Sequence, residues 1–132
     1  MNFQILSPDK IAFDGDVESV LVHGEAGVFQ VLNGHAPILS TLLPGDVKVI
    51  SQGKELHFHA SHGILEFNHN RGVILADSVE RPDEIDVERI KRSREIAERK
   101  LAEARQKIEI HAYEKALMRA ISREKFHEKF PG

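Results

Sequence analysis

Glycine and proline are distributed unevenly along this chain, and their distribution constrains its fold more than any other feature. Eight of the nine glycines precede residue 73, and residues 83–130 contain neither glycine nor proline. Turns depend on these two residue types, whereas a helix interior excludes proline and is weakened by glycine. The 132-residue chain is therefore predicted to divide near Pro82 into a turn-rich region and an uninterrupted helical region.

The turn-rich region has the alternating apolar pattern of β-strands. In residues 55–60, Leu56, Phe58 and Ala60 fall on one face of a strand, and the acidic and histidine residues fall on the other. Residues 17–23 and 73–76 are more continuously apolar, as expected for strands that are covered on both faces. Short strands separated by turns about every ten residues predict a β-sandwich or a β-barrel.

The residues after Pro82 follow a helical period instead. The apolar residues that share one helical face are Ile90, Ala97, Leu101, Ala104 and Ile108. Asp83 is expected to cap the first helix. Much of the helical face is alanine, which buries little area, so a two-helix hairpin would be weakly packed. The bend is expected at residues 106–109, where no helix breaker occurs, so one continuous helix is a second accessible state of this arm.

The two regions also differ in charge. Residues 1–80 carry 4 basic and 10 acidic side chains, a balance of −6, whereas residues 81–132 carry 14 basic and 11 acidic ones, a balance of +3. Acidic and basic residues alternate along the arm, and no aromatic residues are interleaved with the basic ones for base stacking, which argues against nucleic-acid binding. No apolar stretch approaches the roughly 20 residues that cross a bilayer, and no signal peptide is expected. We therefore expect a soluble protein that reaches a membrane only through a partner.

The spacing of the residues bears on two kinds of chemical site. His57 and His59 project from the same side of one strand, and imidazoles at this spacing can share a zinc ion. However, no acidic residue is placed as a further ligand and cysteine is absent, so a solvated strand face is expected and no metal. The chain contains no Gly-x-Ser-x-Gly elbow, phosphate loop or His-Glu-x-x-His motif, so it is not expected to be an enzyme.

The most individual part of the sequence is an apolar run that ends in a loop containing glycine and proline. Gly34-His35-Ala36-Pro37 and the following Leu42-Leu43-Pro44-Gly45-Asp46-Val47 are similar to the signature of the epsilon subunit of the F-type ATP synthase. Similarity continues in the same order at residues 63–66, 73–77 and 85–89, so that it covers almost the whole chain.

The resemblance implies an α+β fold that is mainly β at the N-terminus. A β-sandwich is expected at residues 1–82, and an antiparallel two-helix hairpin at residues 83–132. It also implies a non-catalytic subunit of the central stalk of a proton-translocating synthase, with sodium as the alternative driving ion. In that stalk the sandwich binds the gamma subunit and the ring of c subunits. The family's arm can extend along gamma toward the catalytic alpha/beta head and inhibit ATP hydrolysis.

The family's ring-facing loop corresponds to residues 28–36 of this chain. The expected contacts with the ring or the stalk are Phe29, Gln30, Val31, Leu32, Asn33 and His35. The implied location is peripheral, on the cytoplasmic face of the bacterial inner membrane, with the plastid thylakoid as an alternative.

Some family members bind ATP on the hairpin as a regulatory ligand, although no cofactor is required. The residues that match this site are Glu80, Ile85, Asp86, Arg89, Arg119 and Arg123. Arginine suits the role because its guanidinium can contact phosphate through two hydrogen bonds. The chain departs from the family at Ile90, where alanine is usual, and at Ile96, where a further arginine is usual. Ion pairing along the hairpin is the alternative interpretation of these residues.

A second class of function remains open from the sequence. The chain would then be a free-standing ligand-sensing β-sandwich module whose helical arm forms a dimer, with ATP or a metal as its ligand. This interpretation predicts a stable homodimer, whereas the stalk interpretation predicts stoichiometric binding to a long coiled-coil partner. A nucleic-acid-binding arm ranks third and would show a steep dependence on salt.

Overall fold

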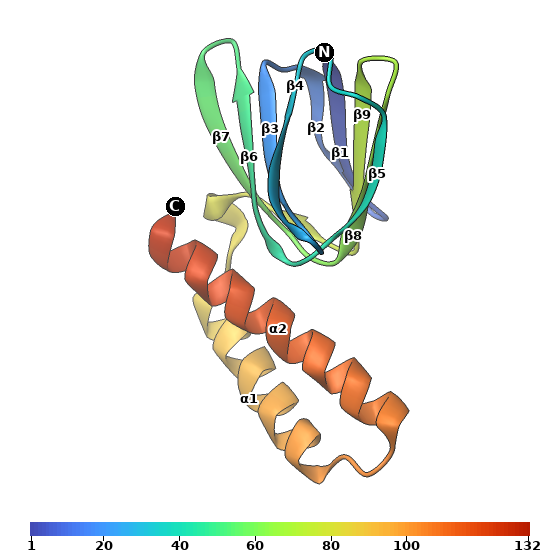
Figure 1. Cartoon of the computed structure of the whole chain (residues 1–132). Helices are drawn as coiled ribbons and strands as arrows, with labels where there is room; N and C mark the ends of the chain where they lie inside the picture. Colours follow the sequence, from blue (N-terminus) through green and yellow to red (C-terminus); the bar gives the residue numbers. More distant parts are fainter.

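Ten short strands form the first region of the chain, and two helices form the second (Figure 1). The computed structural model describes residues 1–132. The strands are β1 (Asn2–Ser7), β2 (Lys10–Asp16), β3 (Ser19–Gly24), β4 (Gly27–Leu32), β5 (Ile38–Leu42), β6 (Gly45–Ser51), β7 (Lys54–Ala60), β8 (Gly63–Asn68), β9 (Arg71–Ala76) and β10 (Val79–Glu80). A 3₁₀ turn, η1 (Pro82–Glu84), leads into α1 (Val87–Glu103) and α2 (Lys107–Lys129).

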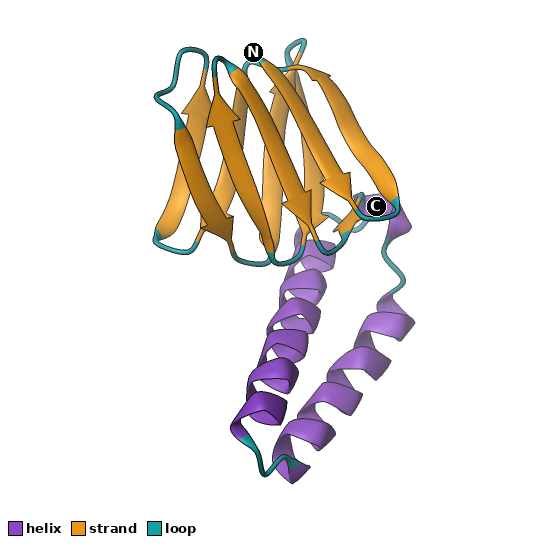
Figure 2. Ribbon diagram, turned by 90° about the vertical axis from the view of Figure 1, so that its right-hand side faces the viewer, coloured by secondary structure: helices purple, strands orange, loops and turns teal.

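The strands fold into two layers that face each other (Figure 2). One layer has the order β10-β7-β6-β3, with β4 paired to the other edge of β3, and the other layer has the order β5-β8-β9-β1-β2. The two layers join where Gly24 of β3 pairs with Leu42 of β5. Only β1 and β9 run parallel. The predicted β-sandwich is therefore confirmed, in agreement with alternating burial along its strands.

The core lies between the layers and consists of the inward side chains of both. Phe3 and Phe67 pack with their ring centroids 6.0 Å apart, and both are almost completely buried. Val20, Val49 and Ile74 are fully buried around them. Phe58 and Ala60 also face the core as predicted, whereas Leu56, near the start of β7, is 36% exposed.

One expectation about strand faces was wrong. Residues 73–76 were expected to be covered on both sides, but only Ile74 and Ala76 of β9 are buried, whereas Val73 and Leu75 are 36% and 51% exposed. Leu75 pairs directly with Leu6 on one side and with Ile64 on the other, so an apolar row crosses the outer face of this layer. The continuous apolar run therefore reflects one core face and one apolar outer face.

The first helix begins three residues later than the sequence suggested. Asp83 lies within η1, where its carboxylate accepts a hydrogen bond from Arg81 Nε at 3.3 Å. Asp86 is the actual cap of α1, because its side chain accepts a hydrogen bond from the backbone N–H of Arg89 at 3.2 Å. The intervening turn uses Pro82 at its first position, which suits the fixed φ angle of proline.

The predicted antiparallel hairpin is confirmed, since α1 and α2 run side by side in opposite directions (Figure 2). Ile90 and Ala97 of α1 and Ala120 of α2 are buried. An ion pair between Arg94 Nη1 and Glu124 Oε2, 2.7 Å apart, joins the two helices. The bend lies at residues 104–106, slightly before its expected position, and Ile108 is 77% exposed rather than part of the packed face. Neither helix is long and apolar enough to cross a lipid bilayer.

Candidate functional site

The loop between β4 and β5 lies at the end of the sandwich opposite the helical hairpin (Figure 1). Gly34 has a φ of 82°, a left-handed conformation that favours glycine. Its backbone N–H donates to Asn70 Oδ1 at 2.9 Å, and Asn70 Nδ2 donates to Asn33 Oδ1 at 2.7 Å. The turn between β8 and β9 therefore holds this loop in a defined shape, and we call the two together the distal end.

The predicted ring or stalk contacts occupy β4 and this loop, but they are not equally exposed. Gln30, Leu32 and Asn33 face solvent, and Leu32 is 51% exposed. His35 is half-buried with its ring 6.0 Å from that of Phe67. The half-buried Phe29 packs against the core.

The side chain of Val31 is a correction to this set. It is fully buried in the core, because its position in β4 points inward between exposed neighbours. A partner cannot contact this side chain without opening the sandwich. Val28, which was not among the named contacts, is 58% exposed but lies at the other end of the same strand, opposite His23.

The opposite end of the sandwich holds the last turns of α2. Ser122 Oγ lies 2.9 Å from His59 Nε2, and the ring of Phe126 meets His59 edge to face at 5.6 Å. One turn later, Phe130 stacks on His57, with ring centroids 3.9 Å apart and planes inclined by 26°. We call these five residues, with Glu80 and Arg123, the arm interface.

The histidine face of β7 is therefore covered by α2, whereas the sequence suggested that it was solvated. His57 Nδ1 lies 2.9 Å from Asp46 Oδ2, and His57 Nε2 lies 2.8 Å from Glu55 Oε2. His59 is directed to Ser122 instead, so the two imidazoles have separate partners. The structure brings together no group of three or more histidine and acidic residues in a metal-binding arrangement.

Burial under α2 also changes the chemistry of His59. Its side chain has no exposed surface, and its Nδ1 has no hydrogen-bond partner. Burial, together with the nearby positive charge of Arg123, lowers the pKa of His59 to about 4. The imidazole is therefore neutral at neutral pH while α2 stays in place.

Two of the predicted ATP-binding residues form the strongest polar contact of the arm interface. Arg123 donates from Nε to Glu80 Oε1 at 2.7 Å and from Nη2 to Glu80 Oε2 at 2.8 Å. Both side chains are largely buried, at 16% and 18% exposure. This bidentate geometry is the one that arginine also uses with phosphate, and here the carboxylate of Glu80 occupies it.

The other predicted ATP-binding residues surround this ion pair without joining it. Ile85 follows η1, and Asp86 and Arg89 form the first turn of α1, where Asp86 is occupied as the helix cap. Arg119 lies one turn before Arg123 on α2 and is half-buried. Of the two departures from the family pattern, Ile90 is fully buried, and Ile96 is 44% exposed.

The chain terminus completes this end of the molecule. A Cβ built on Gly132 would lie 3.5 Å from the carbonyl oxygen of Pro82, so the last residue reaches back to the turn that joins sandwich and arm. Sequence reasoning missed Ser122, Phe126 and Phe130 as interface residues. Their spacing of four residues places them on one face of α2, and this spacing is the sequence signal that could have identified them.

Comparisons with known proteins agree with this architecture. The family model for the beta-sandwich domain of the ATP synthase delta/epsilon chain matches residues 1–82. The ATP synthase epsilon chain of Desulforamulus reducens is 37% identical over 124 residues, which cover 94% of each chain. The chain belongs to the ATP synthase epsilon chain family. The epsilon chain of Nitratidesulfovibrio vulgaris strain DP4 is 34% identical over 93% of this chain and 92% of its own.

Solved structures show the same fold. A chain of the mitochondrial ATP synthase of Euglena gracilis, solved as OSCP/F1/c-ring, superposes with a TM-score of 0.77 at 22% identity, over 93% of this chain and 78% of that one. A chain from the central stalk/c-ring of the Tetrahymena thermophila mitochondrial synthase gives a TM-score of 0.64 at 12% identity, over 94% and 93%. Membership of the epsilon chain family confirms the predicted resemblance. As predicted, the chain is an accessory subunit rather than a catalytic one.

Proposed function

We propose that this epsilon chain works in the central stalk of a proton-translocating F-type ATP synthase. In this proposal the sandwich couples the gamma subunit to the c-ring, and the arm inhibits ATP hydrolysis by the alpha/beta head when it extends. The subunit would be peripheral to the membrane, on the cytoplasmic face of the bacterial inner membrane. The observation that carries the proposal is the separation of two candidate contact regions, the distal end and the arm, at opposite ends of the sandwich (Figure 1).

The outer face of the sandwich supports a third contact region. Ile64, Val73 and Leu75 of β8 and β9 are 36–51% exposed, and Leu39 of the neighbouring β5 is 72% exposed. An exposed group of large apolar residues on a sheet face is typical of a protein-binding surface. We assign this face to the gamma subunit, because a lateral contact leaves the distal end free for the ring.

The arm interface supports a movable arm. The helices contact the sandwich mainly through α2, by one ion pair, one histidine–serine hydrogen bond and two aromatic contacts. Binding partners can break a set of contacts this small and release the arm, because a change between two conformations needs only a few kcal/mol of differential binding. ATP, as a regulatory ligand near Arg119 and Arg123, would then favour the docked arm.

Reconstitution tests the proposal. The alpha, beta and gamma subunits of the same synthase, prepared without epsilon, would be assayed for ATP hydrolysis after addition of the full chain or of residues 1–86. This truncation keeps η1 and its ion pair between Glu84 and Lys10, which are 2.8 Å apart. We expect both forms to bind gamma and only the full chain to inhibit. If neither form bound gamma and the full chain formed a stable homodimer, the result would favour the ligand-sensing module instead.

A further inference from the structure

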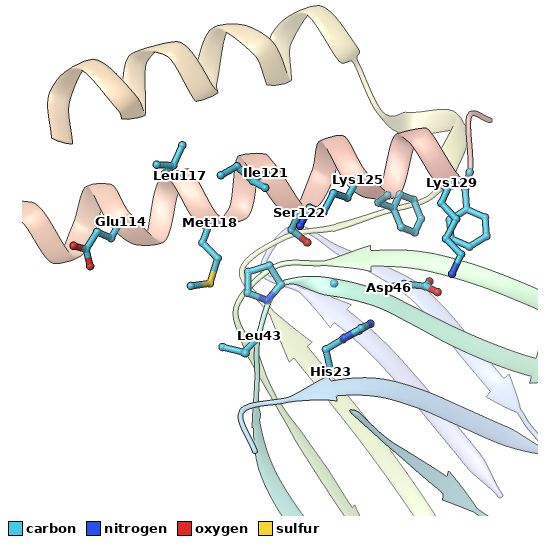
Figure 3. A pocket seen from close by; sticks show the side chains of 14 residues that line it. His23, Leu43, Asp46, Glu114, Leu117, Met118, Ile121, Ser122, Lys125 and Lys129 are labelled. Carbon is cyan, nitrogen blue, oxygen red and sulfur yellow. The ribbon is translucent and has the colours of Figure 1, made fainter. Parts of the chain in front are cut away.

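A cleft of about 670 Å³ separates α2 from the sandwich (Figure 3). One wall is the face of α2 from Glu114 to Lys129 together with its C-cap, Phe130, and the other is His23 with the residues from Leu43 to Asp46. Small-molecule sites occupy about 300–1,000 Å³ and are mostly apolar with a few placed polar groups. The volume of this cleft falls within that range. Because both the arm and the sandwich supply its walls, the cleft exists only while the arm is docked.

The middle of the cleft is apolar and open to solvent. Met118 and Leu43 face each other from the two walls and are 47% and 38% exposed (Figure 3). Leu117 and Ile121 extend the same lining along α2. A hydrocarbon chain lying between the two walls would remove their exposed apolar area from water, which favours its binding.

One end of the cleft is positively charged. Lys125 and Lys129 lie one helical turn apart on α2, both line the cleft and both are exposed (Figure 3). The ion pairs of this part of α2 are made by Arg123 and Glu124 instead, so the two ammonium groups are free to receive an anion. Lys129 Nζ is 5.5 Å from the centroid of the Phe130 ring, which keeps it at the edge of the cleft.

A hydroxyl group lies next to this charged end. His59 is neutral, and its Nδ1 is buried without a partner, so we assign its single proton to Nε2, where it is donated to Ser122 Oγ over 2.9 Å. The opposite tautomer would bury an N–H donor without an acceptor, which is the rarer situation in proteins. In this arrangement Ser122 keeps its own hydrogen to donate into the cleft, one turn before Phe126.

We propose that this cleft binds an amphiphilic anion of the long-chain carboxylate class. The carboxylate lies between Lys125, Lys129 and the Ser122 hydroxyl, and the hydrocarbon chain runs past Met118. The charge distribution fixes this direction, because Glu114 stands at the other end, about 16 Å from Lys125 along the helix at ~1.5 Å per residue. Asp46 also lines this end of the cleft, where its carboxylate contacts His57 Nδ1 at 2.9 Å, and the two lysines outnumber this one negative charge.

Binding at this place has a consequence for the arm. A ligand that requires both walls binds the docked arm and not the released one, so it stabilises the docked state by an amount that grows with the logarithm of its concentration relative to its dissociation constant. The binding itself does not depend on the proposed function, because it follows from the cleft alone. Only an effect on ATP hydrolysis would rest on the proposed role of the arm.

Methionine methyl groups offer a direct measurement of binding. The chain contains two methionines, Met118 in the cleft and Met1, which packs against the core at the distal end. The full chain, labelled with methyl-¹³C methionine, would be titrated with dodecanoate below the concentration at which it forms micelles. We expect the Met118 signal to shift with saturation while the Met1 signal stays in place. No shift of Met118, or equal shifts of both signals, would overturn the proposal.

Charge recognition is tested with variants and with neutral probes. The double variant Lys125→Gln, Lys129→Gln should weaken dodecanoate binding about tenfold, because it removes both cations facing the head group. The matched control is Lys107→Gln, Lys115→Gln, on the same helix but outside the cleft lining, which should bind as the unmodified chain does. Equal affinity for 1-dodecanol, or unchanged affinity in the double variant, would show an apolar cleft without anion recognition and would refute the assignment.

Arm position supplies the second readout. Two cysteines introduced by Lys54→Cys and Ile108→Cys can be spin-labelled uniquely, because the chain has no cysteine of its own. Dodecanoate should increase the population at the docked distance in the full chain and have no such effect in the Lys125→Gln, Lys129→Gln variant. Binding without this shift would refute the coupling to the arm while leaving the proposed stalk function untouched.

Discussion

Arg123 of α2 holds the carboxylate of Glu80 of β10 through two hydrogen bonds of 2.7 and 2.8 Å. Glu80 is the last strand residue before the turn that leads into the arm, and Arg123 belongs to the final turns of the arm. The pair therefore joins the C-terminal end of the arm to β10, the strand from which the chain enters the arm. Removal of either partner leaves the other charge largely buried and unpaired.

We predict that Arg123→Ala weakens docking of the arm by about 1.5–3 kcal/mol, the range for hydrogen bonds to charged groups. The distance distribution between spin labels at Lys54→Cys and Ile108→Cys would report the released fraction. Lys91→Ala, an exposed residue of α1, is the control and should leave the distribution unchanged. In a double-mutant cycle with Glu80→Ala, strictly additive effects would contradict a direct interaction.

The aromatic contacts should contribute more to docking than the ion pair. Phe126 is 4% exposed and meets His59, so Phe126→Ala is expected to cost about 3–5 kcal/mol of docking and hairpin stability. Limited trypsin digestion would measure this loss of docking, because residues 81–132 carry 14 lysines and arginines at which trypsin can cleave. We expect faster cleavage of the arm and an intact sandwich fragment. Phe126→Leu should restore most of the protection, and equal cleavage of both variants would contradict the prediction.

Docking should weaken on acidification because of His59. Its pKa is about 4 beneath the arm and near 6.5 when the arm is released, so the released state binds more protons between these values. The contribution is complete above pH 6.5 and is lost as the pH falls toward 4, to a total of up to roughly 3 kcal/mol. The label distances would be recorded across this range.

The control for the pH experiment is His59→Gln, which cannot titrate but keeps a side-chain donor for Ser122. His57 also faces the arm, between Asp46 and Glu55 and against Phe130, and it remains present in this variant. Its own titration is therefore measured in the same experiment. A pH profile that is as steep in His59→Gln as in the unmodified chain would assign the effect to His57 or its carboxylates and exclude His59 as its source.

At the distal end, Leu32→Arg should prevent binding to the proposed ring partner without unfolding the sandwich. The side chain is 51% exposed, so the substitution changes the surface rather than the core. Co-purification of the assembled synthase would measure binding, and thermal denaturation would measure folding. Val31→Asp is the contrasting variant, which should unfold the sandwich because it places a charge at a fully buried position. Normal assembly of Leu32→Arg would contradict a role for this loop.

Titration calorimetry tests the proposed regulatory ATP site. ATP should bind the isolated full chain, and Arg119→Ala should weaken binding about tenfold by removing one phosphate contact. Arg105→Ala, at the bend of the hairpin, is the matched control. Absence of heat up to millimolar ATP would show that the Arg123–Glu80 pair is purely structural.

Periodicity predicted the architecture well because burial imposes it directly. Phe58 and Ala60 face the core as the alternation predicts, and Ile90 and Ala97 lie on the buried side of α1. Capping was less predictable, since Asp83 and Asp86 are both suitable acidic residues. The proline at position 82 decided between them by forming a separate turn before the helix. The local sequence pattern alone does not show which of the two aspartates caps the helix.

Contacts between distant segments were the least predictable part of the site. His57 and His59 have the spacing of a solvated polar face, and only the return of α2 over β7 buries them. Likewise, Val73 and Leu75 read as core residues because an apolar outer face has the same composition as a buried one. Tertiary packing and partner binding both select apolar side chains, so composition alone does not distinguish them.

The placement of the distal loop and the arm at opposite poles makes the sandwich a rigid spacer. Strands of six or seven residues, at about 3.3 Å each, hold the poles roughly 20 Å apart. Movement of the arm therefore does not disturb the contacts that the distal loop makes at the other end of the sandwich. If the proposed function holds, the arm can therefore change its position while the sandwich stays attached to the rest of the stalk.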